Sequence, residues 1–323
     1  MHKRIYILTL MFLSIWACKK VDVLRITKVT SDEVIVEKTQ VSATGTIIDQ
    51  AKEGVDTFGH CWSTNINPSI DDNKTTLTDV NLGSAYTSNI SNVNYNTTYY
   101  IRTYAKYGEE IIYGKDTTTF KITDISNISI ISSQLQIEDE STLSIDGSIT
   151  GLNSLNALDY GHCWSTNSAP TINDSLTSLG ALNTDINYST NISDLSQNVN
   201  YYVRAYVKID ASTVVYSTEL STLIPDLEVT TNNNFITGSS ALLTGTIVSL
   251  GVLPVTDHGH CWSTTTSTPS INNNVISLGA KTTAGTFDTS LTPLSTGNTY
   301  YYCAYAIKNG NTIKYGAIQS FSF

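Results

Sequence analysis

The chain has 323 residues, of which 40% are hydrophobic and only 14% are charged, and its formal net charge is −10. This acidic balance, with a sequence pI near 4.8, argues against nucleic acid or an anionic membrane surface as a partner. The length allows two or three domains. The 19 Tyr, together with frequent β-branched residues, favour strands over helices.

The first 17 residues have the pattern of a signal peptide. Residues 2–4 are His-Lys-Arg, and residues 5–16 form an apolar run that is too short to span a bilayer. Residues 15–18, Ile-Trp-Ala-Cys, resemble a bacterial lipobox, in which Cys18 would carry the lipid and become the mature N-terminus. An ordinary signal peptide followed by a chance Cys is the alternative.

A lipid on Cys18 would make the protein a peripheral outer-membrane lipoprotein, held by its N-terminal acyl anchor. Residues 18–20 then serve as anchor and linker. Lys19 and Lys20 are followed by Asp22, and a Lys followed by acidic residues directs some Gram-negative lipoproteins to the cell surface. Surface display is therefore favoured over the periplasmic face.

The hexapeptide Gly-His-Cys-Trp-Ser-Thr occurs three times, at Gly59–Thr64, Gly161–Thr166 and Gly259–Thr264. The copies are spaced by 102 and 98 residues, which is the size of a small β-sandwich domain. This period predicts three domains after the anchor, with the boundaries 21–123, 124–225 and 226–323.

Short strands separated by turn residues follow one another through the first repeat. Val23–Val29 alternates as an edge strand does, Glu33–Gln40 and Val41–Ile48 together carry a second strand, and Val55–Thr64 is the third. After a turn at Asn67–Asn73, further strands are expected at Gly83–Ile90, Asn96–Ala105, Ile111–Gly114 and Thr117–Ile122. The other repeats keep this order and no segment shows a helical stripe, so the prediction is an all-β fold of three tandem sandwiches.

Three motifs recur in each repeat: Gly-x-Cys-Trp-Ser-Thr, then Asn/Ser-x-Pro-Ser/Thr-Ile-Asx, then Thr/Val-x-Tyr-Tyr-x-Arg-x-Tyr-Ala followed by Tyr-Gly. This pattern resembles the fibronectin-type-III-like tandem domains of Bacteroidota-type surface lipoproteins, and it covers essentially everything after residue 20. The resemblance implies an immunoglobulin-like sandwich, a fold that serves spacers, adhesins and binding modules alike. The sequence departs from the pattern at Cys303, where the other repeats have Arg102 and Arg204, and at Tyr216-Ser217, which replaces Tyr-Gly.

Two aromatic residues of each repeat are expected in the core. The first Tyr of the long strand can form a tyrosine corner, with its ring in the core and its hydroxyl bonded to nearby backbone. That role is assigned to Tyr99, Tyr201 and Tyr300. The hexapeptide Trp sits in mid-strand and recurs in every domain, as a packing residue does: Trp62, Trp164 and Trp262.

Strand alternation sends an Arg flanked by two Tyr to the opposite face of the same strand. These residues are Tyr100, Arg102 and Tyr104 in the first repeat, and Tyr202, Arg204 and Tyr206 in the second. An Arg between two Tyr suits stacking and cation–π contact. Two interpretations are open: stabilisation of the sheet surface, or a platform that contacts a glycan or a peptide.

The hexapeptide His and Cys alternate along the strand, so their side chains point to opposite faces. Convergent metal ligands are therefore not expected, and neither is a cofactor. No Ser-His-Asp or Cys-His-Asp set can be nominated, so an enzyme is not predicted. The Asx residues at 71–73, 173–174 and 272–274 predict turns, with calcium binding as the alternative.

Cysteine usage singles out the third repeat, which alone has a second cysteine after the anchor region. If the strands that carry Cys261 and Cys303 are neighbours and both side chains face the same way, a disulfide is possible. It would close a loop of 42 residues and contribute ~4 kcal/mol in the chain-entropy account. Cys61 and Cys163 would remain buried free thiols.

The sequence thus predicts a non-enzymatic, lipid-anchored cell-envelope protein that acts in binding or adhesion, with a glycan or a protein as its ligand. The alternative is a structural spacer or scaffold component of a surface complex, with no ligand of its own.

Overall fold

The computed structural model describes residues 26–309 and 312–323, and their regular secondary structure consists of strands β1 to β24. The predicted signal peptide, the lipid site at Cys18 and the linker at 18–20 lie outside these residues. Across the described ranges, no helix could cross a membrane.

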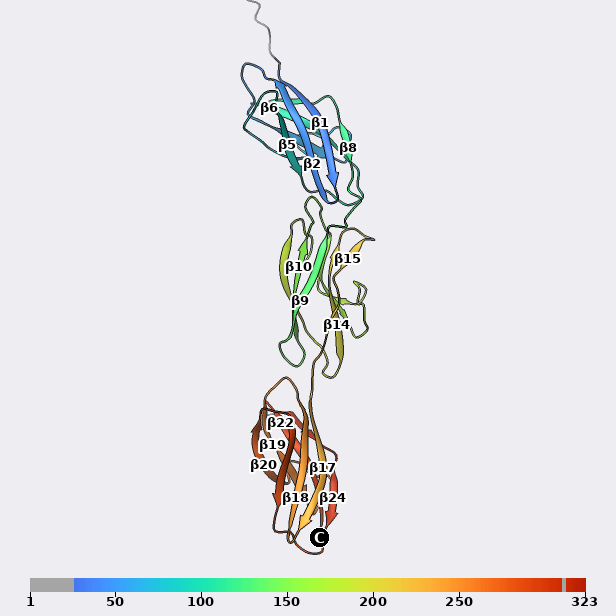
Figure 1. The fold of residues 1–323 in the computed structure, drawn as a ribbon, viewed down its shortest axis with the longest axis vertical. Helices are drawn as coiled ribbons and strands as arrows, with labels where there is room; N and C mark the ends of the chain where they lie inside the picture. Colours follow the sequence, from blue (N-terminus) through green and yellow to red (C-terminus); the bar gives the residue numbers. More distant parts are fainter. Residues whose placement is uncertain (1–25, 310–311) are drawn as a thin grey trace, which may run out of the picture. The chain divides into compact units, whose positions relative to one another are not determined.

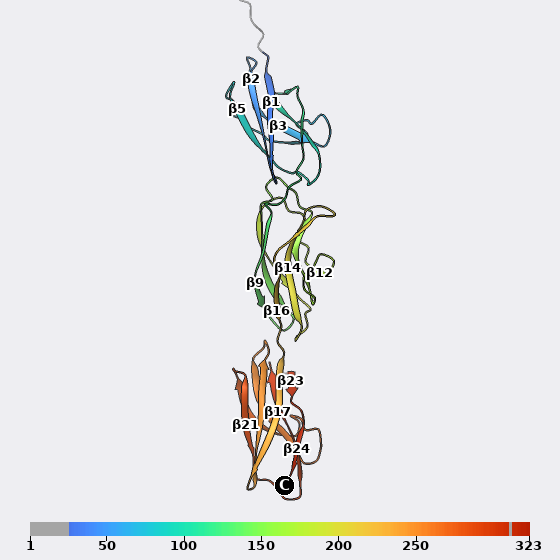
Figure 2. The ribbon, with the colours of Figure 1, turned by 45° about the vertical axis from the view of Figure 1, so that its right-hand side comes forward.

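The strands form three similar antiparallel groups, each with a three-stranded sheet facing a five-stranded sheet (Figures 1 and 2). The predicted all-β fold of three tandem β-sandwiches is confirmed. In the first sandwich the smaller sheet consists of β1 (Lys28–Glu37), β2 (Gln40–Asp49) and β5 (Ala85–Ile90). The larger sheet consists of β4 (Asn73–Lys74), β3 (Thr57–Ser63), β6 (Tyr99–Tyr107), β7 (Glu110–Tyr113) and β8 (Thr118–Phe120).

The second sandwich repeats this plan. Its smaller sheet consists of β9 (Ser129–Ile137), β10 (Leu143–Thr150) and β13 (Ile186–Ile192). Its larger sheet consists of β12 (Ser175–Leu176), β11 (Asp159–Ser165), β14 (Asn200–Lys208), β15 (Val214–Tyr216) and β16 (Leu220–Leu223).

The third sandwich has the same strand order. Its smaller sheet consists of β17 (Leu227–Thr237), β18 (Ser240–Leu250) and β21 (Gly285–Leu291). Its larger sheet consists of β20 (Asn274–Lys281), β19 (Val255–Ser263), β22 (Thr299–Lys308), β23 (Thr312–Tyr315) and β24 (Gln319–Ser322). The predicted domain boundaries fall between β8 and β9 and between β16 and β17.

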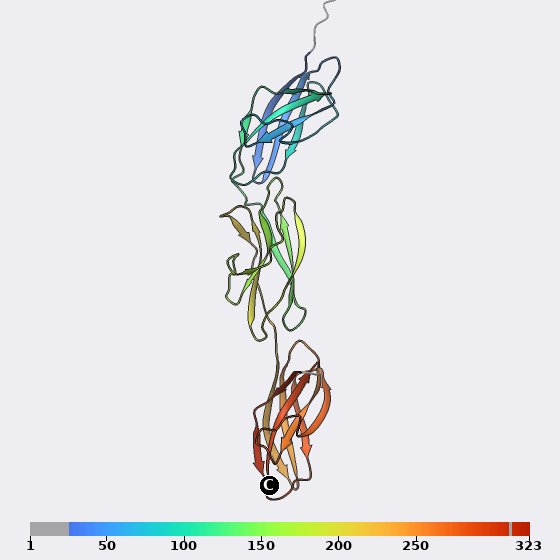
Figure 3. The same cartoon turned by 180° about the vertical axis from the view of Figure 1, so that it is seen from behind.

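The core of each sandwich lies between its two sheets, which face one another when seen from either side (Figures 1 and 3). In the second sandwich, β10 buries alternate side chains, as the period of two along a strand requires. Leu143 and Ile145 of β10 pack in one cluster with Tyr201 and Val203 of β14. All four side chains are buried, so this cluster joins the two sheets.

The predicted strand that joins Glu33–Gln40 to Val41–Ile48 is wrong. β1 continues to Glu37, and a turn at Lys38 and Thr39 leads back into β2. Lys38 has a φ of 56°, a conformation in which glycine is the usual residue. The turn was missed because neither Gly nor Pro marks it in this repeat, whereas Gly238 has a φ of 58° between β17 and β18.

The glycine that opens each hexapeptide is required by a close backbone approach. A Cβ atom on Gly59 would lie 2.4 Å from the Thr75 carbonyl oxygen. The corresponding distances are 2.2 Å from Gly161 to Thr177 and 1.9 Å from Gly259 to Ile276. Side chains cannot enter these contacts, so only glycine lets the segment after the hexapeptide return across the strand.

Candidate functional site

The hexapeptide Cys lies on the face of the larger sheet that points away from the inter-sheet core. Cys61 is fully buried, and its thiol donates to the Pro68 carbonyl at 3.5 Å. In the second sandwich the thiol of Cys163 makes the same contact with the Pro170 carbonyl, at 3.5 Å. The segment after the hexapeptide, which contains Pro68 in the first sandwich and Pro170 in the second, therefore covers this face of the sheet. It is called the covering segment below.

The hexapeptide His lies on the other face, in the core. The Nδ1 atom of His60 is 2.9 Å from the Ser88 hydroxyl, and that of His162 is 2.8 Å from the Thr190 hydroxyl. His260 has the same kind of partner in the third sandwich. Burial lowers the pKa of each of these three His to about 4, so they are neutral at pH 7. The predicted divergence of His and Cys is confirmed.

The expectation that Tyr104 and Tyr206 lie on an exposed face is wrong. Their side chains are only 2% and 1% exposed. The Tyr104 hydroxyl donates to the Thr75 carbonyl at 2.8 Å, and the Tyr206 hydroxyl donates to Asp159 at 2.8 Å. Strand alternation identified their face correctly, but it could not show that a later segment covers that face.

Arg102 and Arg204 connect this covering segment to the sheet. The guanidinium carbon of Arg102 lies 3.9 Å from the ring centroid of Tyr113, and that of Arg204 lies 4.5 Å from Tyr216. The expected cation–π contact thus involves the neighbouring strands β7 and β15. These contacts support the interpretation of sheet stabilisation. Of the six residues proposed for ligand contact, the two remaining ones are half-buried Tyr100 and Tyr202.

The tyrosine corner is confirmed in two sandwiches. The Tyr201 hydroxyl accepts a hydrogen bond from the Ser196 backbone N–H at 2.9 Å. The Tyr300 hydroxyl accepts one from Ser295 at 2.8 Å. Tyr99 is buried and stacks on Phe120 with the ring centroids 5.6 Å apart.

The hexapeptide Trp residues differ in exposure. Trp62 is only 1% exposed, so its predicted core position is confirmed. Trp164 and Trp262 are half-buried. Trp164 packs against the core cluster that contains Tyr201, and Trp262 lies 5.7 Å from Tyr300 between ring centroids. Each therefore has one side in the core and another side open to solvent.

The Asx residues that follow the Pro of each repeat close turns, as predicted. Asp72 accepts a hydrogen bond from the Ser69 N–H at 2.8 Å, and Asp174 accepts one from Thr171 at 2.8 Å. In the third sandwich the neutral side chain of Asn273 accepts the equivalent bond at 2.9 Å. Because an amide replaces the carboxylate in the same role, charge is not needed there.

An open groove of about 770 Å³ lies on the second sandwich. Trp164 of β11 and Tyr201 of β14 form its aromatic part, and Leu195 adds an aliphatic side chain. Its other lining residues are Ser, Thr, Asn and Asp from the end of β11, the segment that leads into β12, and the β13–β14 connection: Ser165, Thr166, Asn173, Asp174, Ser175, Ser193 and Asp194.

This groove was not found from the sequence. Its two polar segments are separated along the chain and read as ordinary turns. Antiparallel pairing places β11 between β12 and β14. Trp164 of β11 lies opposite Ser175 of β12 on one side and opposite Val203 of β14 on the other. The volume lies in the range of ligand sites, and the lining combines two aromatic residues with side chains that can form hydrogen bonds.

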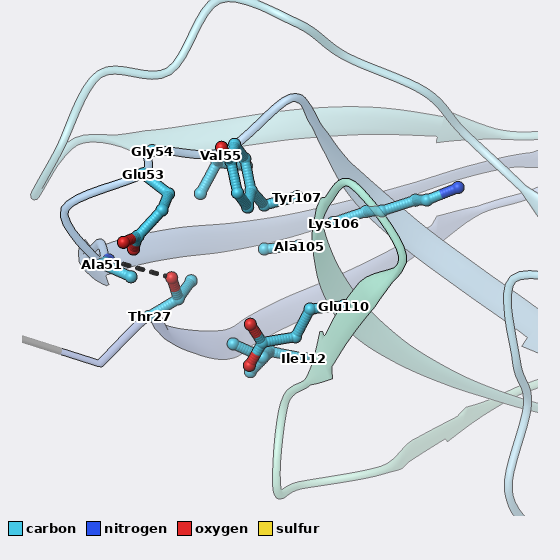
Figure 4. A pocket seen from close by; sticks show the side chains of 10 residues that line it. All are labelled: Thr27, Ala51, Glu53, Gly54, Val55, Ala105, Lys106, Tyr107, Glu110 and Ile112. Atoms are coloured by element: carbon cyan, nitrogen blue, oxygen red, sulfur yellow. Dashed lines mark hydrogen bonds between the residues drawn. The ribbon is translucent and has the colours of Figure 1, made fainter.

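A smaller pocket lies at one end of the first sandwich (Figure 4). Its volume is about 80 Å³, well below that of typical ligand sites. Glu53 and Glu110 line it, and the Lys106 amine points away from the other side chains. A hydrogen bond from the Ala51 N–H to the Thr27 hydroxyl, 3.1 Å long, holds its rim. This pocket is too small to be the main candidate site.

Among residues 26–309 and 312–323, no group of three or more His, Cys, Asp or Glu is arranged to hold a metal ion. The chain matches no protein-family model and no curated protein sequence.

Proposed function

We propose that the protein is a non-enzymatic, lipid-anchored binding protein of the cell envelope, and that the groove of its second sandwich binds a glycan. The observation that carries the ligand class is the composition of the groove. Seven of its ten lining residues are Ser, Thr, Asn or Asp, and they share the groove with the half-buried Trp164.

A sugar ring has apolar C–H bonds on its faces and hydroxyl groups around its edge. The open side of Trp164 offers an aromatic surface for such a face. The exposed side chains of Asn173 and Ser193 can exchange hydrogen bonds with the hydroxyl groups. An extended apolar peptide would find few apolar neighbours in this groove, so a glycan is the better fit.

In this proposal the repeated motifs serve packing, and the groove of one sandwich serves binding. The hexapeptide and the Asx turns recur in all three sandwiches, and the Arg contacts in the first two, because they serve packing. A binding site needs to occur only once. Lipid attachment at Cys18 and display at the outer membrane are part of this proposal, and they rest on the lipobox-like sequence Ile-Trp-Ala-Cys at 15–18.

A glycan array probed with the full chain tests the proposal. Binding to a defined set of oligosaccharides is expected, and Asn173→Ala with Ser193→Ala should weaken it at least tenfold. Asn272→Ala is the matched control, because Asn272 follows Pro-Ser-Ile as Asn173 follows Pro-Thr-Ile. That variant should bind like the unmodified chain.

Three results would contradict the proposal. Equal losses for the groove variant and the control would place the site elsewhere. Binding to proteins of the cell surface but to no oligosaccharide would replace the glycan with a protein ligand. A folded chain that binds no surface polymer at all would favour the spacer or scaffold role.

A further inference from the structure

Cys261 of β19 lies directly opposite Cys303 of β22. Directly opposed residues of an antiparallel pair have Cα atoms about 4.5–5.5 Å apart, which is inside the range that a disulfide requires. Both side chains are fully buried, and their sulfur atoms are 3.1 Å apart. The expectation that these two strands are neighbours, with both cysteines on one face, is confirmed.

The other two sandwiches have an Arg at the position of Cys303. Cys61 lies opposite Arg102, and Cys163 lies opposite Arg204. In the first sandwich this Arg donates to the carbonyl of Pro68 and so connects the covering segment to the sheet. In the third sandwich the equivalent carbonyl belongs to Pro269, and the Cys303 thiol donates to it at 3.5 Å.

A thiol is a weak hydrogen-bond donor, so it replaces the guanidinium poorly. The third sandwich therefore lacks the charged donor that reaches this carbonyl at 2.6 Å in the first sandwich and at 3.5 Å in the second. A covalent bond between the opposed cysteines would stabilise this part of the third sandwich instead, because it would link β19 to β22 beneath the covering segment.

We infer that Cys261 and Cys303 form a disulfide, and that the third sandwich depends on the redox state for part of its stability. The oxidant is another disulfide, which reacts by thiol–disulfide exchange. The Cys261 thiolate attacks one of its sulfurs and releases the first thiol. The Cys303 thiolate then attacks the Cys261 sulfur of the mixed disulfide and releases the second. Two electrons and two protons pass to the oxidant.

The other two cysteines of the sandwiches take little part in such an exchange once they are buried. Burial raises the pKa of Cys61 and of Cys163 to about 11, so these thiols react slowly. Ile271, on the covering segment, packs against Cys261 and Cys303, so the exchange takes place before that segment closes.

Peptide mass spectrometry of the full chain, prepared without reductant, tests the inference. The chain is denatured, alkylated with iodoacetamide and digested with trypsin. Cleavage after Lys208, Lys281 and Lys308 places Cys261 and Cys303 in separate peptides, 209–281 and 282–308. The expected result is one joined product of these two peptides, with Cys61 and Cys163 alkylated. Alkylation of all four cysteines would overturn the inference.

Thermal unfolding with and without dithiothreitol gives a second readout. The transition of the third sandwich should move to lower temperature when dithiothreitol is added. Cys303→Ser should lose this sensitivity, whereas the matched variant Cys163→Ser should keep it. An unmodified chain whose unfolding is identical in both conditions would contradict the redox dependence. If Cys303→Ser does not fold, the mass of the unmodified chain still decides.

Discussion

Arg102 donates a hydrogen bond from its Nε atom to the Pro68 carbonyl, over 2.6 Å, across the face of the sheet that strand alternation had suggested to be open. The same side chain stacks on Tyr113. The hydroxyl of Tyr113 in turn accepts the N–H of Ile70 at 3.1 Å. Arg102 and Tyr113 thus hold the covering segment of the first sandwich from two sides.

Arg102→Lys should lower the free energy of unfolding of the first sandwich by about 1–2 kcal/mol, because a charged hydrogen bond and a stacked guanidinium are both lost. Lysine keeps the charge but lacks the planar fork. Urea unfolding of Arg102→Lys, Tyr113→Leu and the double variant measures the coupling. A coupling of about 0.5–1 kcal/mol is expected, and strictly additive losses would show that the two side chains act independently.

Gly161→Ala should destabilise the second sandwich by about 1–3 kcal/mol, the typical cost of forcing atoms into a packed site. The added Cβ would lie 2.2 Å from the Thr177 carbonyl oxygen. Gly180→Ala is the comparison in the same sandwich: a Cβ there meets nothing within 4 Å, so its loss reports only the strain of a left-handed backbone at a φ of 88°, and Gly161→Ala should lose more. Comparable losses for the two variants, measured by urea unfolding, would show that the close approach is not what requires glycine.

Acidification should weaken each sandwich through its buried His. The pKa of His260 is 6.5 in the unfolded chain and about 4 in the folded one. The unfolded chain therefore binds more protons between these two values, so stability is complete above pH 6.5 and falls as the pH drops toward 4. The slope is about 1.4 kcal/mol per pH unit for one His.

Urea unfolding at a series of pH values from 7.5 to 4.5 measures this slope for the third sandwich. His260→Gln removes the titrating group, so the slope between pH 6.5 and 5 should become nearly flat for that sandwich. A variant with the same pH dependence as the unmodified chain would assign the effect to other groups.

Much of the fold could be predicted from the sequence because its signals are local and repeated. The period of the hexapeptide indicated three domains, and the alternation around Trp62 indicated which residues face the core. The turn at Lys38 could not be predicted, because no Gly or Pro marks it. The burial of Tyr104 could not be predicted either, because it depends on where a later segment of the chain packs.

The candidate site was less accessible to sequence reasoning. Asn173 and Ser193 belong to two turns far apart in the sequence, and nothing local shows that they line one groove. That relationship arises from strand pairing in three dimensions. The cysteine pair was easier to predict, because Cys303 breaks a repeated pattern at a defined position.

Tryptophan fluorescence during titration with an array-positive oligosaccharide is the most direct test of the central claim, which is that the groove at Trp164 binds a glycan. The emission should change in a saturable way in the unmodified chain. The change should disappear in Trp164→Phe and persist in Trp262→Phe, whose Trp is also half-buried beside a core Tyr. The account would be contradicted if Trp164→Phe kept the full change in emission, or if only Trp262→Phe lost it.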